Sequence, residues 1–305
     1  MFKRTKAWSI GLTTDKGPVK KVNEDRMLLR LIKDSVGDEL LFALVADGMG
    51  GYQYGDLASQ TIVDFFENWL DQYGANLFLA DHPFIYLEQA LPLAFSTLND
   101  KLIEYGDFYQ KKLGSTLTLL VLYKGRYFVG HVGDSRIYHW EKIQPYRFDQ
   151  TDRLYPIEPE TEALAPNQTL TQLTDDHSWV NQQVKQGQLS KQAAQSHPKR
   201  HVLLQCLGIE AKLDPYFTQG AYQIADIFVL CSDGVHTILP EQKLISAIEL
   251  LTNQPSRFQQ QADLLVQLVS ASEGATDNIT LMLIQPRYLV RPRGFKHKVA
   301  QLFLG

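Results

Sequence analysis

Five apolar runs of strand length place the strongest constraint on how this chain can fold. The second and third runs are separated only by Lys124-Gly125, which is the pattern of a tight β-hairpin. At least this part of a sheet is therefore expected to be antiparallel. The runs are residues 40–46, 115–123, 126–132, 226–231 and 278–284.

Amphipathic helical patterns lie between these runs, mostly in pairs. Residues 56–73 carry apolar side chains at spacings of three and four, and residues 84–105 form a second pattern in which Pro92 predicts an internal break. Two later helices are expected at 242–251 and 258–270. Because the helices do not alternate with every strand, an α+β layered fold is favoured over a doubly wound parallel sheet.

The composition excludes several classes of protein. The 305 residues are 44% hydrophobic, which allows a sizeable core, and the net charge of −4 lacks the basic excess of a nucleic-acid binder. Cys206 and Cys231 lie inside apolar runs and are expected to be buried free thiols. Because no segment resembles a signal peptide or reaches the ~18 apolar residues of a membrane span, we expect a cytoplasmic protein.

Acidic residues recur where apolar runs begin or end. Carboxylates at strand ends can meet at one edge of a sheet, and oxygen-only clusters suit Mg²⁺ or Mn²⁺. A single Asp-Gly after a strand is most often only a turn. Five such positions together instead predict a two-metal centre, which could activate water and clamp a phosphoryl group. The residues concerned are Asp47, Asp134, Asp233, Asp277 and the pair Glu24 and Asp25.

Eight short motifs occur in an order that resembles the metal-dependent protein phosphatases of type 2C (the PPM family), especially their bacterial members. The resemblance covers roughly residues 8–285. The motifs are NED (23–25), DGMGGYQYGDLAS (47–59), GST (114–116), VGDSRIY (132–138), LTDDHS (173–178), HPKRHVLLQCLG (197–208), SDG (232–234) and TDN (276–278).

The resemblance implies one phosphatase domain, residues 1–285, built as a four-layer α/β/β/α sandwich. Two mainly antiparallel sheets would be flanked by helix pairs. Residues 141–172 are interpreted as an insertion that either binds a partner or is a passive loop, and residues 174–201 as a flap. Residues 286–305 would form a basic C-terminal tail that docks on the body or on an acidic surface.

The resemblance also implies metal ligands. Asp47 would bridge two Mn²⁺ or Mg²⁺ ions, and Gly48 would contribute its backbone carbonyl. Glu24 would serve one of these ions, and Asp233 and Asp277 the other. Asp134 would, together with Asp233, hold a third, weaker ion. The complete set is Glu24, Asp47, Gly48, Asp134, Asp233 and Asp277.

Three further residues are assigned catalytic roles by the same resemblance. Asp25 would orient metal-bound water, and Asn278 would lie beside the metals. Lys20 stands where family members commonly have the arginine that binds the substrate phosphate. It keeps the charge but loses the bidentate fork, so it is either a phosphate ligand or part of a solvated loop.

The implied reaction is direct hydrolysis of phosphoserine or phosphothreonine by a metal-bridged hydroxide, which reverses Ser/Thr kinase signalling. Phosphorylated proteins and a kinase pathway are the implied partners, and a monomer is expected. Lys199 and Arg200 in the flap would face the substrate or form a solvated basic face.

Animal members of the family have a histidine general acid where this chain has Met49, so His177 and His131 are candidates for that role. A pseudophosphatase that binds phosphoproteins without hydrolysis is the main rival. A two-metal nuclease would explain the carboxylates but not the eight motifs.

Overall fold

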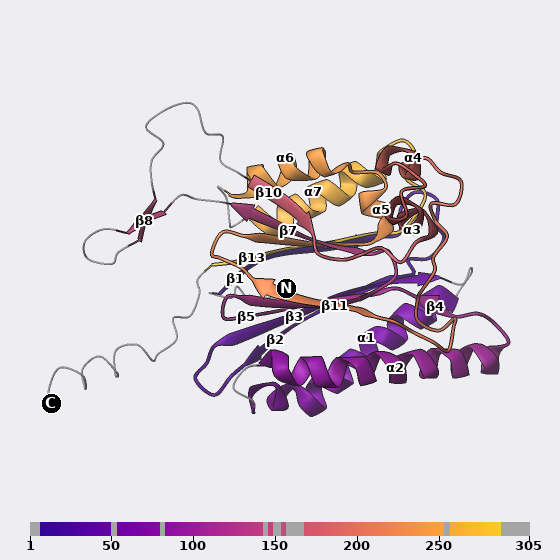
Figure 1. The fold of residues 1–305 in the computed structure, drawn as a ribbon, viewed down its shortest axis with the longest axis horizontal. Helices are drawn as coiled ribbons and strands as arrows, with labels where there is room; N and C mark the ends of the chain where they lie inside the picture. The colour runs from indigo at the N-terminus through magenta and orange to yellow at the C-terminus, as the bar shows by residue number, and fades with distance from the viewer. Residues whose placement is uncertain are drawn as a thin grey trace, which may run out of the picture.

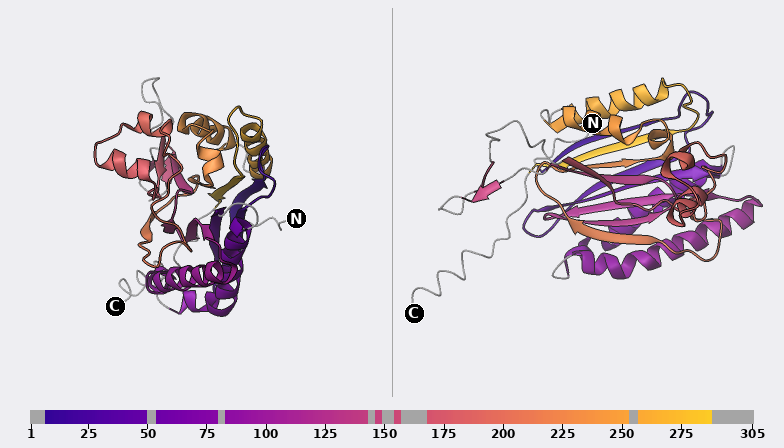
Figure 2. Two further views of the ribbon diagram at one scale, coloured as in Figure 1. Left: turned by 90° about the vertical axis from the view of Figure 1, so that its right-hand side faces the viewer. Right: turned by 45° about the horizontal axis from the view of Figure 1, so that its top comes forward.

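A computed structural model describes residues 7–49, 54–79, 83–142, 146–148, 154–156, 168–252 and 257–287 of the chain (Figure 1). Two antiparallel sheets pack face to face, and helices cover both outer faces (Figures 1 and 2). The expected four-layer α+β sandwich is therefore confirmed. None of the helices in these described ranges has the length and apolar character needed to cross a membrane.

The first sheet has the strand order β1-β13-β12-β7-β10. Helices α6 (Glu241–Thr252) and α7 (Phe258–Ser270) lie over its outer face, and α7 packs on β1 and β13. Its strands are β1 (Trp8–Asp15), β13 (Ile279–Pro286), β12 (Ile227–Cys231), β7 (Arg136–Lys142) and β10 (Gln168–Gln172).

The second sheet has the order β11-β6-β5-β3-β2, with β4 (Gly114–Ser115) paired to the end of β3. Its outer face is covered by α1 (Tyr54–Tyr73), the 3₁₀ helix η1 (Gly74–Phe78) and α2 (Pro83–Tyr109). Its strands are β11 (Tyr216–Ala221), β6 (Arg126–Val132), β5 (Leu117–Tyr123), β3 (Glu39–Met49) and β2 (Asp25–Lys33).

The long apolar runs are explained by burial on both faces. In β5, Leu119 and Val121 face the helix layer, while Leu120 and Leu122 face the other sheet. A strand buried on both sides needs no polar alternation, so it appears in the sequence as one continuous apolar run. The expected hairpin is confirmed, because β5 and β6 pair around Lys124 and Gly125.

The expected break at Pro92 is wrong, since α2 runs unbroken from Pro83 to Tyr109. An interior proline costs a helix about 3 kcal/mol. Here Pro92 lies on the exposed side, and Leu87, Leu91 and Phe95 bury the opposite side in the core. Packing on both sides of the proline offsets the lost hydrogen bond.

Part of the expected insertion belongs to the sheet. Residues 168–172 form β10, which pairs with β7, and residues 141–142 complete β7. A small two-stranded element, β8 (Tyr146–Phe148) with β9 (Leu154–Pro156), lies between them. The remaining residues of that segment, and residues 288–305 of the expected tail, lie outside the described residues.

The flap contains two short helices, α3 (Trp179–Lys185) and α4 (Lys191–Gln195), each with a serine as its N-cap. The side chains of Ser178 and Ser190 accept hydrogen bonds from the backbone of Asn181 and Ala193. These helices project sideways from the sandwich near α5 (Asp233–His236) (Figure 2, left). Both cysteines are free and buried, as expected.

Candidate metal centre

The predicted carboxylates gather at the end of the sandwich where β4, α5 and the flap lie (Figure 1). Asp25 begins β2 and stands opposite Asp47 of β3 in the antiparallel register. Asp233 begins α5, separated from the end of β12 only by Ser232, and Asp277 precedes β13. Asp134 lies in the loop from β6 to β7, where the chain crosses between the sheets. Both sheets therefore contribute to one cluster.

Crowding and burial raise the pKa values of these groups. Burial, followed by the charges of Asp25 and Asp233, raises the pKa of Asp47 well above its ordinary value. Burial and then the charge of Asp134 raise the pKa of Asp233 in the same way. Burial is also the main reason that the pKa of Asp134 rises to about 7 and that of Asp25 to about 6. A cation among these groups would remove their mutual repulsion.

Three buried carboxylate oxygens in this cluster have no hydrogen-bond partner. They are Glu24 Oε1, Asp25 Oδ1 and Asp233 Oδ1. Buried oxygens without partners are uncommon and call for an ion or water. Because the donors are carboxylate oxygens, the cluster fits a hard divalent cation such as Mg²⁺ or Mn²⁺.

Lys20 lies inside the carboxylate cluster. Its Nζ is 2.6 Å from Asp277 Oδ1 and 4.0 Å from Glu24 Oε2. Burial alone would lower the pKa of Lys20, but the hydrogen bond and charge of Asp277 outweigh it and raise the pKa. The ammonium group is thus held charged beside two of the carboxylates.

Asn278 holds the loop that carries Lys20 and Glu24. Its Oδ1 accepts a hydrogen bond from the Glu24 N–H at 2.8 Å. Its Nδ2 donates to the carbonyl oxygens of Lys16 at 2.9 Å and Val22 at 3.0 Å. The side-chain amide is therefore occupied by backbone groups, which gives Asn278 a positioning role behind Glu24.

The backbone of Asp47 is fixed by the GST motif. The Asp47 N–H donates to Thr116 Oγ1 at 2.9 Å, and the Asp47 carbonyl accepts from Ser115 Oγ at 3.0 Å. A Cβ atom on Gly48 would lie 2.0 Å from the Gly55 carbonyl oxygen. Only glycine lets the end of β3 approach the first turn of α1 this closely.

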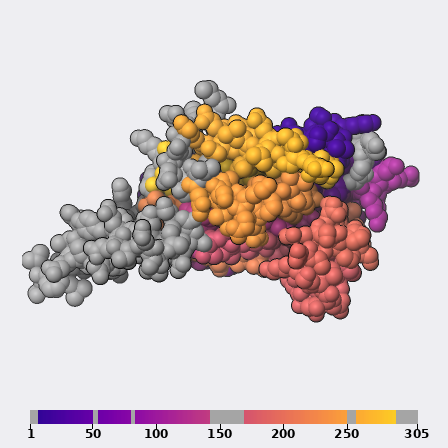
Figure 3. Space-filling model, turned by 90° about the horizontal axis from the view of Figure 1, so that it is seen from above, coloured from indigo at the N-terminus to yellow at the C-terminus, as the bar shows by residue number. Residues whose placement is uncertain are grey.

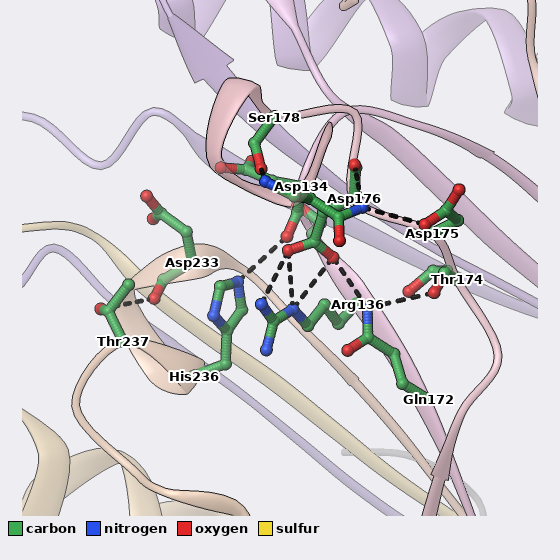
Figure 4. Close-up of polar contacts among 12 residues, drawn as sticks. Asp134, Arg136, Gln172, Thr174, Asp175, Asp176, Ser178, Asp233, His236 and Thr237 are labelled. Atoms are coloured by element: carbon green, nitrogen blue, oxygen red, sulfur yellow. Dashed lines mark hydrogen bonds and ion pairs between the residues drawn. The ribbon is translucent and has the colours of Figure 1, made fainter. Parts of the chain in front are cut away.

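The loop that carries Asp134 is held from two sides (Figure 4). On the flap side, the Arg136 guanidinium binds both carboxylate oxygens of Asp176, with Nη2 to Oδ2 at 2.7 Å. His177 adds a backbone hydrogen bond to the Gly133 carbonyl at 2.7 Å. From α5, His236 Nε2 donates to the Asp134 carbonyl at 3.0 Å. His236 was not among the residues predicted from the sequence, and only its position three residues after Asp233 could have suggested it.

The side-chain hydrogen bonds of His131 and His177 are made with groups other than the carboxylates of the cluster. His131 Nδ1 bonds Thr118 Oγ1 at 2.8 Å, and burial lowers its pKa to about 3. His177 Nδ1 accepts from the Gly133 N–H at 3.2 Å, and burial lowers the pKa of this ring as well. Both rings are neutral and held in place, which fits structural roles better than proton donation.

A different histidine reaches the cluster. His201 Nδ1 lies 4.0 Å from Asp233 Oδ2, and the ring is more than half exposed. The residues of the flap predicted to face the substrate were Lys199 and Arg200, the two exposed residues that precede this histidine. The signal available in the sequence was the HPKRH motif at residues 197–201. Its last residue is this histidine, which directly follows the two basic residues.

Comparison with known proteins decides the family. The protein-family model described as "Protein phosphatase 2C" matches residues 19–270, which is most of the chain. The chain belongs to the protein phosphatase 2C family. This confirms the resemblance drawn from the eight motifs.

Named relatives agree with this assignment. This protein phosphatase is 28% identical over 282 residues to the serine/threonine phosphatase Stp of Listeria welshimeri, covering 92% of this chain and 96% of that one. The structure of the Streptococcus agalactiae serine/threonine phosphatase matches with a TM-score of 0.69 and 26% identity, covering 91% and 99% of the two chains. The catalytic domain of the phosphatase PstP, solved with two manganese ions, shares the fold with a TM-score of 0.63, 22% identity and 92% and 98% coverage.

Proposed function

We propose that this protein phosphatase hydrolyses phosphoserine and phosphothreonine in proteins by a metal-dependent reaction. The observation that carries the proposal is the set of carboxylates from both sheets that meet at one end of the sandwich with three buried oxygens left unpartnered. The named relatives, which are serine/threonine phosphatases, support the substrate class.

The residues that would hold two core cations are Glu24, Asp47, the Gly48 carbonyl, Asp233 and Asp277, with Asp134 and Asp233 at a third site. Bound divalent cations would lower the pKa of a water molecule and offset the charge of the phosphoryl group. The oxygen donors suit either ion; manganese is favoured by the two manganese ions in the similarly folded PstP.

The chain's own side chains would prepare the phosphoryl group for attack. Lys20 supplies a fixed positive charge beside Asp277, which suits a phosphate oxygen. Asp25 has one oxygen bound by Ser232 Oγ at 2.7 Å and one left free, so it can orient a water molecule. His201, at the edge of the cluster, is the histidine best placed to meet the leaving oxygen.

Phosphoproteins of a Ser/Thr kinase pathway are the proposed partners, and a monomer in the cytoplasm is the proposed state. No observation favours the pseudophosphatase, because every carboxylate of the expected set is present and the named relatives are phosphatases. The family match gives no support to the alternative of a two-metal nuclease.

The test is a phosphatase assay with purified protein. We expect Mn²⁺-stimulated hydrolysis of p-nitrophenyl phosphate and of phosphothreonine peptides, and loss of both activities in EDTA. Asp47→Asn should remove most of the activity while circular dichroism shows a folded protein. A metal-loaded protein that is inactive on both substrates would contradict the proposal.

A further inference from the structure

The flap presents a basic turn, residues 197–201, that is closed by its own hydrogen bonds; we call it the flap turn. The Arg200 N–H donates to the His197 carbonyl at 3.0 Å, and the Val202 N–H donates to the Lys199 carbonyl at 3.0 Å. The His197 ring adds a third bond, accepting the Lys199 N–H at Nδ1 at 3.1 Å. Lys199 and Arg200 therefore stand on a fixed backbone.

Trp179, at the start of α3, braces this turn. Its ring stacks on His197 with 4.9 Å between centroids, and Lys199 Nζ lies 4.6 Å from the centroid of the same indole. A cation over an aromatic face is attracted by the ring quadrupole, and tryptophan is the strongest partner. The backbone N–H of Trp179 also donates to the Val202 carbonyl at 2.8 Å, so backbone and side chain both join α3 to the turn.

The positive charge of the flap turn is not neutralised by the flap's own acids. Asp176 is bound by Arg136, and Asp175 pairs with Lys185. Within the described part of the chain, no carboxylate oxygen lies within 4.0 Å of the Lys199 or Arg200 side-chain nitrogens, and both residues are exposed. The turn therefore offers two cationic groups to a partner.

The flap turn borders the carboxylate centre. His201 Nδ1 is 4.0 Å from Asp233 Oδ2, and Lys199 and Arg200 directly precede His201 in the chain. The space-filling view shows the flap as a salmon-coloured lobe standing out from the body, open to a large partner (Figure 3). A chain whose phosphoryl group enters the centre would run past this turn.

We propose that the flap turn binds carboxylate side chains flanking the phosphorylated residue, so that acidic phosphosites are the preferred protein substrates. This inference rests on the proposed phosphatase function. Arginine binds a carboxylate through two parallel hydrogen bonds, and a turn that is already ordered avoids the cost of ordering a loop on binding. Trp179 is a positioning residue, because it acts by holding Lys199 and the turn.

The experiment compares three phosphothreonine peptides that differ only in the residues on either side of the phosphothreonine, which are glutamate, glutamine or lysine. With the Mn²⁺-loaded full chain at low salt, kcat/KM should be about five- to tenfold higher for the glutamate than for the glutamine peptide, as expected of two exposed ion pairs. The preference should shrink as salt is added. Equal values for all three peptides would overturn the inference.

Variants locate the source of the preference through the ratio between peptides, which is unaffected by a general loss of rate. Arg200→Glu should reverse the order and favour the lysine peptide. Lys243→Glu makes the same charge change at an exposed position of α6 and should keep the wild-type order. An equal reversal by both variants would overturn the assignment to the flap turn.

The role of Trp179 is tested by a pair of variants. Trp179→Leu should bring the glutamate-to-glutamine ratio towards one, mainly through KM, whereas Trp179→Phe should keep most of the ratio because a ring remains. A wild-type ratio in Trp179→Leu would refute the bracing role. A wild-type protein inactive on every peptide and on p-nitrophenyl phosphate would instead refute the phosphatase function itself.

Discussion

Replacing Asp25 by asparagine is expected to stabilise the metal-free protein while removing activity. Asp25 is only 1% exposed, and burial, partly offset by hydrogen bonds from Thr280 and Ser232, raises its pKa from 3.8 to about 6. At about 1.4 kcal/mol per pKa unit, ionising this carboxyl costs the folded state about 3 kcal/mol. Subtracting about 1 kcal/mol for a weaker hydrogen bond to Ser232 leaves a gain of about 2 kcal/mol.

The gain should depend on pH. Between pH 3.8 and about 6, the folded state holds a proton on Asp25 that the unfolded state has lost, so the stability of the wild type falls as pH rises through this window. Above the pKa of Asp25 in the folded state, the contribution of this carboxyl to the free energy of unfolding no longer changes with pH. Asp25→Asn should therefore be more stable than the wild type at pH 7.5 and should have no such advantage at pH 4.

Urea unfolding in EDTA at pH 7.5 and pH 4, followed by circular dichroism, measures this difference. The control is Asp100→Asn, which removes an exposed carboxylate of α2 and should leave the free energy of unfolding nearly unchanged. Two results would refute the claim that ionised Asp25 destabilises the metal-free fold. One is that Asp25→Asn is no more stable than the wild type at pH 7.5, and the other is that the same gain appears at pH 4.

Two further predictions concern neighbouring residues. Lys20→Ala should chiefly raise KM for phosphopeptides. Lys20→Arg should keep KM low, because it preserves the cation near Asp277. An unchanged KM in Lys20→Ala would mean that Lys20 forms the ion pair with Asp277 but does not bind the substrate phosphate. Gly48→Ala should lower the free energy of unfolding by about 1–3 kcal/mol, since its Cβ would lie 2.0 Å from the Gly55 carbonyl oxygen, and a wild-type urea midpoint would show that the backbone relaxes freely.

The strands with continuous apolar runs could be predicted from the sequence, because a strand buried on both faces consists almost entirely of apolar residues. Several strands were missed, among them β1, β2 and the interior strand β7, and two of the missed strands have a different character. In β11 (Tyr216–Ala221) no residue is fully buried, and β10 (Gln168–Gln172) is polar and lies at a sheet edge. Edge strands exchange hydrogen bonds with only one neighbour, so their sequences need little apolar content.

The break expected at Pro92 failed for a related reason. Local propensity counts the lost hydrogen bond of the proline but not the packing of Leu91 and Phe95 against the sheet. That packing is made with residues distant in the chain. It cannot be weighed until the layers are known.

The sequence by itself determined the family, the layered α+β class and the identity of the acidic residues, because eight ordered motifs and strand-end carboxylates are local features. The tertiary structure alone decided how those residues meet. Pairing of β2 with β3 sets Asp25 opposite Asp47, and Asn278 binds the backbone of Glu24 across 254 positions of the chain.

The choice among the histidines shows the same division most clearly. The sequence suggested His177 and His131 as general acids, yet their rings are hydrogen-bonded to Gly133 and Thr118. His201 of the flap turn lies 4.0 Å from Asp233. Residue type sets what a side chain can do, but its partners are set by sheet pairing and flap placement. Those depend on contacts between distant segments, which no local pattern encodes.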